Sequence, residues 1–164
     1  MKTIKFFHPE GKFTYYIEKC FCKVVYVDQQ HQLLIEVHST DDLDHVEEDS
    51  LQNEFSQVIL TIDDFPVPFE NLDELVGQTI DIPTSYVEIE DEEGELDDYL
   101  YTHVNFSEED FEADDNELSF YKNEAGTLCL KWKGRVQNFT EHDDEYIPFE
   151  LECEFSKPKF EIND

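Results

Sequence analysis

The stretch Tyr146–Phe155 has the sequence YIPFELECEF and shows the clearest regular pattern in the chain. From Ile147 onward every second residue is apolar, and the residues between are Pro148 or glutamates. A period of two is that of a β-strand with one face in a core and the other in water, whereas a helix repeats every 3.6 residues. We therefore predict a half-buried strand here.

Other segments show the same alternation, or short apolar runs bounded by turn residues, and predict further strands. Residues 71–77 carry the one helical signal, a short turn that Gly77 would end. Strands that recur about every 10 residues predict an all-β fold, mainly an antiparallel sandwich or barrel with at most one or two short helices. No linker or repeat interrupts the chain, so we expect residues 1–164 to form a single acidic β-rich domain. The predicted strands are 13–27, 32–38, 55–62, 79–82, 86–89, 98–104, 117–121 and 127–132.

The composition supports a folded protein rather than a disordered acidic chain. Of its 164 residues 39% are hydrophobic, including 14 Phe and 8 Tyr, which is enough apolar surface for a core. The N-terminus lacks the apolar segment of a signal peptide, and no stretch of about 18 apolar residues predicts a membrane span. We expect a cytoplasmic protein whose cysteines are reduced. The cysteines are Cys20, Cys22, Cys129 and Cys153.

The charge is far from balanced. The chain has 42 acidic and 11 basic residues, a formal net charge of -31, and it contains no Lys or Arg between Val24 and Tyr121. One large region must therefore be uniformly negative. Nucleic acids and anionic membranes repel such a surface, so we expect neither as a partner and expect basic proteins or multivalent cations instead.

Acidic residues are concentrated in four runs, at 41–49, 88–98, 108–115 and 141–145. A single run is typical of a solvated loop, but four runs without interspersed cations favour electrostatic binding. Aromatic residues among the acids, including Phe106, would anchor a partner there. The predicted partner-binding residues are Glu90, Asp91, Glu92, Glu93, Glu95, Asp97, Asp98, Tyr99, Tyr101, Glu108, Glu109, Asp110, Phe111, Glu112, Asp114 and Asp115.

Three basic residues flank the single tryptophan, Trp132, and form the one cationic-aromatic cluster. These residues are Lys131, Lys133 and Arg135. We expect them to pair with acidic residues of the same chain rather than to form a separate ligand site.

Metal, cofactor and catalytic motifs are not evident. An EF-hand loop with Gly94 or Gly126 at its sixth position would begin at Ile89 or Tyr121, which cannot supply the first carboxylate; an irregular calcium loop stays open. Cys20 and Cys22 share a strand face, which favours burial over a soft-metal site. Carboxylates are too abundant for a catalytic pair to stand out. We predict no cofactor, no metal and no enzymatic activity.

These observations predict a binding protein that neutralises a basic protein partner. The most concrete form is a bacterial immunity protein that inhibits a toxin, such as a nuclease, by occupying its cationic site as a nucleic-acid mimic. Two alternatives remain: an acidic scaffold or chaperone-like buffer of basic proteins, and a protein whose acidity is an adaptation to its environment.

Overall fold

The computed structural model describes residues 3–27, 29–40, 42–70, 72–90, 92–106, 109–140, 145–155 and 159–162. Strands dominate these ranges, and the helices in them are the 3-10 helices η1 (Leu51–Glu54) and η2 (Leu72–Leu75). The strands are β1 (Thr3–His8), β2 (Gly11–Val27), β3 (Gln30–Ser39), β4 (Val58–Pro66), β5 (Thr79–Ile82), β6 (Tyr86–Glu90), β7 (Leu96–Leu100), β8 (Thr102–Phe106), β9 (Glu109–Lys122), β10 (Leu128–Gln137), β11 (Tyr146–Glu154) and β12 (Lys159–Ile162).

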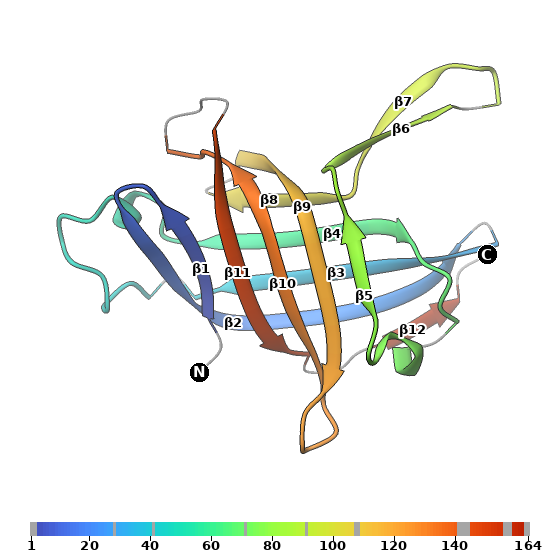
Figure 1. The fold of residues 1–164 in the computed structure, drawn as a ribbon, viewed down its shortest axis with the longest axis horizontal. Helices are drawn as coiled ribbons and strands as arrows, with labels where there is room; N and C mark the ends of the chain where they lie inside the picture. Colours follow the sequence, from blue (N-terminus) through green and yellow to red (C-terminus); the bar gives the residue numbers. More distant parts are fainter. Residues whose placement is uncertain are drawn as a thin grey trace.

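The main sheet closes into an antiparallel β-barrel (Figure 1). Its strands follow the order β1-β11-β10-β9-β8-β4-β3-β2, and the ring closes because β1 pairs with both β11 and β2. Outside the ring, β5 pairs with β9, and β12 runs parallel to the second half of β2. The prediction of an all-β fold is confirmed, and of the two architectures left open the barrel is the one that forms.

Strand β11 shows how the sequence pattern builds this barrel. Ile147, Phe149, Leu151 and Cys153 are all buried, while the glutamates between them are partly exposed. The predicted alternation is therefore confirmed. A single-residue slip of the register would turn all of these apolar side chains to the outside, so the pattern also determines how β11 pairs with β10.

Aromatic side chains fill the barrel around Phe6 of β1. The Phe6 ring lies 5.8 Å from that of Tyr15 on β2, 5.4 Å from that of Phe106 on β8 and 5.8 Å from that of Phe149 on β11. Phe139 stacks on Phe106 with their centroids 4.0 Å apart. Aromatic pairs of this kind contribute about 0.5–1.5 kcal/mol each beyond the burial of their surface. The short strand β1 therefore closes the barrel with its side chains as well as with its backbone.

Several predicted elements form with shifted boundaries. The strands predicted at 13–27 and 32–38 are the hairpin β2–β3. The predicted helical turn is η2, and Gly77 follows it with φ +83°, a conformation that glycine adopts most readily; Asn71 lies outside the described residues. Strand β4 starts later than expected and continues through Asp63, whose N–H donates to the carbonyl of Tyr101. The short strands β1 and β12 were not expected.

The prediction of one strand over 98–104 is wrong. The chain forms β7 and β8 on either side of Tyr101, whose N–H donates to the carbonyl of Ser85 rather than continuing a ladder with a barrel strand. The Tyr101 ring is buried and meets Phe65 edge-on at 5.3 Å. This residue is therefore the corner at which the chain enters the barrel.

None of the helical segments in the described ranges has the length and apolar character that crossing a bilayer requires.

The four cysteines, all within the described residues, form no disulfide and are buried, as expected of small apolar core residues. Burial raises the pKa of the Cys22 thiol, which disfavours the reactive thiolate. Cys20 donates a hydrogen bond to the carbonyl of Glu154, 2.8 Å away, near the seam between β2 and β11.

We predict that the native protein does not react with a thiol reagent such as DTNB, because all four of its thiols are buried and inaccessible to the reagent. Unfolding in guanidinium should release all 4 cysteines to the reagent. The absorbance of the released chromophore measures this directly, and stoichiometric labelling of the native protein would contradict the buried arrangement.

Candidate functional site

Strands β6 and β7 form a hairpin arm that projects from the barrel (Figure 1). They constitute a separate two-stranded sheet, with Tyr86 opposite Leu100 at the base and Glu90 opposite Leu96 toward the tip. Gly94, with φ +84°, lies in the connecting turn. The acidic run at 88–98, which on its own is typical of a loop, is therefore the arm itself.

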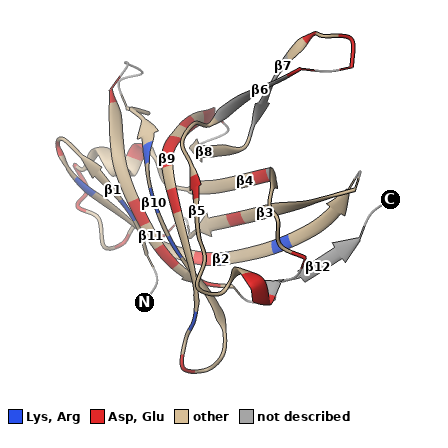
Figure 2. Ribbon diagram, turned by 45° about the vertical axis from the view of Figure 1, so that its right-hand side comes forward, with Lys and Arg blue, Asp and Glu red and all other residues tan. Residues whose placement is uncertain are grey.

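The tip of the arm carries four predicted binding residues that are exposed, Glu90, Glu92, Glu93 and Glu95. Leu96, beside them, is 64% exposed, the most of any large apolar side chain in the described residues. Figure 2 shows this acidic tip standing away from the barrel wall. Asp91 lies outside the described residues. Asp97, Asp98 and Tyr99 belong to β7, and for these three residues the backbone alone is described.

Buried hydrogen bonds hold the base of the arm. The N–H of Ser85 donates to Asp114 Oδ1 at 2.8 Å, and the Ser85 hydroxyl donates to the carbonyl of Thr102. The Thr102 hydroxyl in turn donates to the carbonyl of Ala113 at 2.7 Å. Ser85 and Thr102 are both fully enclosed, so the bonds that their hydroxyls donate form away from water, where leaving a polar group unpaired is costly, while the bond to half-buried Asp114 lies nearer the surface. The arm therefore starts from a rigid point of the barrel.

A β-bulge in β9 places the central residue of this network. Asp115 and Asn116 together lie opposite the single residue Gly134 of β10, because the β9–β10 register shifts there. Asp115 has φ 52°, a left-handed conformation that Asp tolerates better than most residues. Before the bulge the odd-numbered residues Phe111 and Ala113 are buried; after it the even-numbered ones are. The bulge thus turns the polar side chain of Asn116 into the core.

The buried amide of Asn116 joins four strands. Its Nδ2 donates to the carbonyls of Ile82 on β5, at 3.1 Å, and of Ala113 on β9, at 2.8 Å, and lies 3.3 Å from the Thr102 hydroxyl on β8. Its Oδ1 accepts from Trp132 Nε1 on β10 at 2.9 Å. A Cβ on Gly134 would lie 2.9 Å from that same Oδ1, so only glycine leaves room for it. Trp132 is fully buried and belongs to this network rather than to a surface patch.

The second predicted acidic run lies on the barrel wall, in strand β9, and not in a loop. Glu109 and Asp110 are exposed at its start, and Asp110 accepts a hydrogen bond from Asn105. The N–H of half-buried Glu112 donates to Gln137. Asp115 forms an ion pair with Arg135. Glu108 lies outside the described residues.

Among the predicted binding residues whose side chains the structure describes, those of the arm and those of β9 do not share one surface. The arm tip is separate from the β9 wall, and Asp114 and Asp115 are engaged within the protein. Tyr101, Phe106 and Phe111, which were expected to anchor a partner, are 7%, 2% and 6% exposed and so offer little surface for one. Their aromatic rings fall on the inward positions of their segments, where they stabilise the barrel.

Of the acidic run at 41–49, Asp41 lies outside the described residues, and the end of the run lies by the turn between β1 and β2. Glu47, Glu48 and Asp49 are exposed there, along an open groove of about 660 Å³ that Lys12 also lines. Gln52 of η1 is buried beneath it and exchanges hydrogen bonds with the backbone of Thr14. Of the run at 141–145, the structure describes Glu145 alone, which is exposed.

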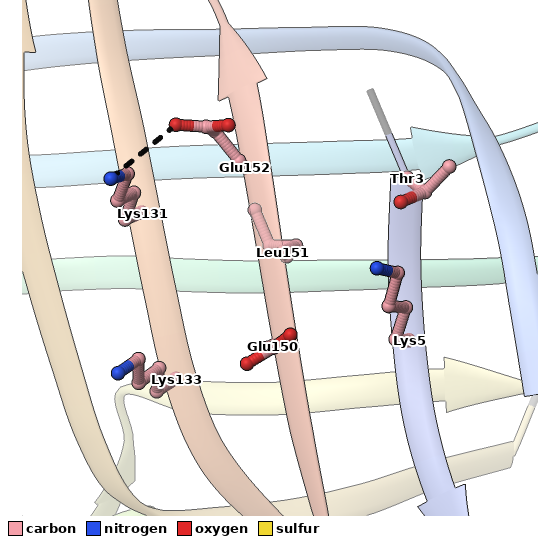
Figure 3. Close-up of a pocket in the computed structure, with 7 residues that line it drawn as sticks. All are labelled: Thr3, Lys5, Lys131, Lys133, Glu150, Leu151 and Glu152. Atoms are coloured by element: carbon pink, nitrogen blue, oxygen red, sulfur yellow. Dashed lines mark ion pairs between the residues drawn. The ribbon is translucent and has the colours of Figure 1, made fainter. Parts of the chain in front are cut away.

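Three basic residues, Lys5, Lys131 and Lys133, form a charge-compensated wall with two glutamates on the outer face of β1, β10 and β11 (Figure 3). Lys131 Nζ lies 3.8 Å from Glu152, and the register places Glu150 between Lys133 and Lys5. An open groove of about 370 Å³ runs over this wall. The prediction that the basic cluster pairs with acids of the same chain is confirmed for Lys131 and for Arg135.

Next to this wall, Tyr146 contacts two of the acids of β9. Partial burial, with hydrogen bonds to Asp114 and Glu112, raises the pKa of Tyr146 to about 12. The phenol therefore stays neutral at physiological pH, and its single O–H lies 3.5 Å from Glu112 Oε2, to which it donates. The guanidinium of Arg135 lies 5.3 Å from its ring. Some of the negative charge on β9 is thus already engaged with neighbouring strands, whereas the arm lies apart from them.

In the described residues no group of three or more His, Cys, Asp or Glu side chains is arranged to hold a metal ion.

Sequence reasoning missed the residues that position the arm, namely Ser85, Thr102, Asn116 and Gly134. Each is small or polar and lies at a strand end or a bulge. The one available signal was the shift of the apolar residues from odd-numbered positions, up to Ala113, to even-numbered positions, from Leu118, which places a bulge close to Asn116. Comparison of the chain with protein-family models, curated proteins and solved structures finds no match.

We predict that Asn116→Ala destabilises the protein by roughly 2–4 kcal/mol, because it leaves Trp132 Nε1 and the carbonyl of Ile82 buried without partners. The matched control is Asn105→Ala, which removes a bond to exposed Asp110 and should cost less than about 0.5 kcal/mol. Urea unfolding measures both. Equal losses would show that the Asn116 network does not hold the barrel at the arm.

Proposed function

We propose that this protein binds and neutralises a strongly basic protein, and that its acidic arm is the main contact. The most concrete form is a bacterial immunity protein in the cytoplasm that inhibits a toxin, such as a nuclease, by occupying the toxin's cationic site. The protein would act by binding alone, without catalysis or a cofactor.

The single observation that carries the proposal is the arm. Residues 86–100 contain eight acidic residues and no Lys or Arg, and they project from the barrel on a base held by buried hydrogen bonds. Uniform charge on a projecting element speeds the encounter with an oppositely charged partner and suppresses binding of anionic ones. A rigid base reduces the conformational entropy that binding would otherwise cost.

The position of the basic residues also supports the arm as the binding surface. Those on β10 lie beside glutamates of β11 or pair with Asp115, and so offset acids on the barrel wall. No Lys or Arg occurs in the arm to offset its acids. A catalytic cleft of a nucleic-acid-cleaving toxin is lined with cations, and a projecting carboxylate-rich hairpin could enter such a cleft in place of a phosphate backbone.

We predict that the arm variant E90Q/E92Q/E93Q/E95Q loses most of its affinity for the partner. Tagged protein is used to capture partners from a lysate of its own source, with elution by a salt gradient and identification by mass spectrometry. The matched control E47Q/E48Q/D49N/E54Q removes the same charge from exposed positions on the barrel. If arm charge drives binding, the control retains the partner, while the arm variant releases it at lower salt with at least about tenfold weaker affinity.

The captured protein is then purified and its activity is titrated with the wild-type chain. One stoichiometric basic protein, inhibited at equimolar ratio, would support the proposal. Many cationic proteins released together at low salt would point to a chaperone-like charge buffer instead. If both variants lose binding equally, net charge alone is responsible and the arm has no special role.

A further inference from the structure

The arm has a backbone feature that its charge does not explain. In the part of the chain that the structure describes, β6 and β7 pair with each other and with no other strand, so each has an outer edge outside any sheet. An outer edge presents a row of N–H and C=O groups that can pair with a further strand. A hairpin of two strands is also only marginally stable in water until a third strand or another layer is added.

We propose that the partner binds by strand addition: an extended, lysine- or arginine-rich segment pairs with an outer edge of β6 or β7 and extends the arm into a three-stranded sheet. This inference rests on the proposed function and specifies its binding mode. Main-chain hydrogen bonds would contribute affinity, and the carboxylates of the arm would select a cationic strand.

The charge on the arm determines which kind of strand can pair with its outer edges. A second copy of this chain would bring another acidic arm and a further net charge of -31, so edge-to-edge pairing of two arms is disfavoured. The register places Glu88 directly opposite Asp98, so the ladder itself contains one pair of like charges. Like charges in cross-strand pairs destabilise a hairpin, and a cationic third strand would relieve this repulsion.

The composition of the arm indicates what the added strand contains. The sequences YVEIE of β6 and LDDYL of β7 mix apolar with acidic residues, and Leu96 is exposed at the start of β7. A segment in which basic residues alternate with apolar ones matches both properties. A purely polar polycation would satisfy the charge but would leave Leu96 in water.

The test uses the full chain and a seven-residue peptide of alternating lysine and valine, capped at both ends. Two further peptides have the same sequence and charge, one N-methylated on every valine and the other on every internal lysine. In an extended peptide the N–H groups of alternate residues point to the same edge. Methylation of the valines therefore removes the N–H donors of one edge and adds bulk there, and methylation of the lysines does the same at the other edge. Isothermal titration calorimetry measures all three affinities, with the arm variant E90Q/E92Q/E93Q/E95Q and the control E47Q/E48Q/D49N/E54Q alongside.

Strand addition predicts that at least one methylated peptide binds about tenfold or more weakly, since several main-chain bonds are lost together. Hydrogen exchange should also slow in residues 86–100 when the unmodified peptide binds, more than in the barrel strands. If all three peptides bind within twofold, strand addition is overturned while charge-driven binding by the arm stands. If the arm variant binds the unmodified peptide as tightly as the control does, the arm is not the site and the proposed function fails as well.

Discussion

The aromatic core around Phe6 must hold together a chain with a formal charge of -31. Self-repulsion of that size favours expansion, and with marginal folding stabilities a few kcal/mol decide whether a compact state persists. Phe6 meets rings from β2, β8 and β11, so the strand that closes the barrel also joins the densest apolar cluster. Every surface feature of the protein depends on that closure, because an open sheet would leave edges along β2 and β11.

Within the barrel, one polar side chain determines where the arm begins. The β-bulge at Asp115 and Asn116 interrupts the alternation of β9 and turns an amide inward, where it bonds groups of β5, β9 and β10. Gly134 leaves the space that this amide occupies. A bulge and a buried polar residue both cost stability unless every bond is made. Here they place Ser85 and Thr102 where the hairpin leaves the wall and returns to it.

The charges are segregated by the same architecture. Lys5, Lys131 and Lys133 share one wall with Glu150 and Glu152, so that wall is nearly neutral. The arm contains acidic residues alone among its charged positions. With the charges divided in this way, the electrostatic potential of the arm is more negative than that of the lysine wall, which is the property on which the proposed binding of a cationic partner depends.

The sequence by itself determined the fold class, most of the strands and the sign of the surface charge. The alternation of apolar and polar residues in Tyr146–Phe155 matches the burial pattern of β11, because side chains of a strand with one buried face point inward at every second residue. Closure of the barrel, the bulge at Asn116 and the burial of Phe106 and Phe111 were decided by tertiary structure. Each depends on residues far apart in the chain, such as Phe6 with Phe149 or Asn116 with Trp132, and no local pattern encodes which strands become neighbours. The acidic runs were visible as composition, but only the pairing of β6 with β7 separates the arm from the acids of the wall.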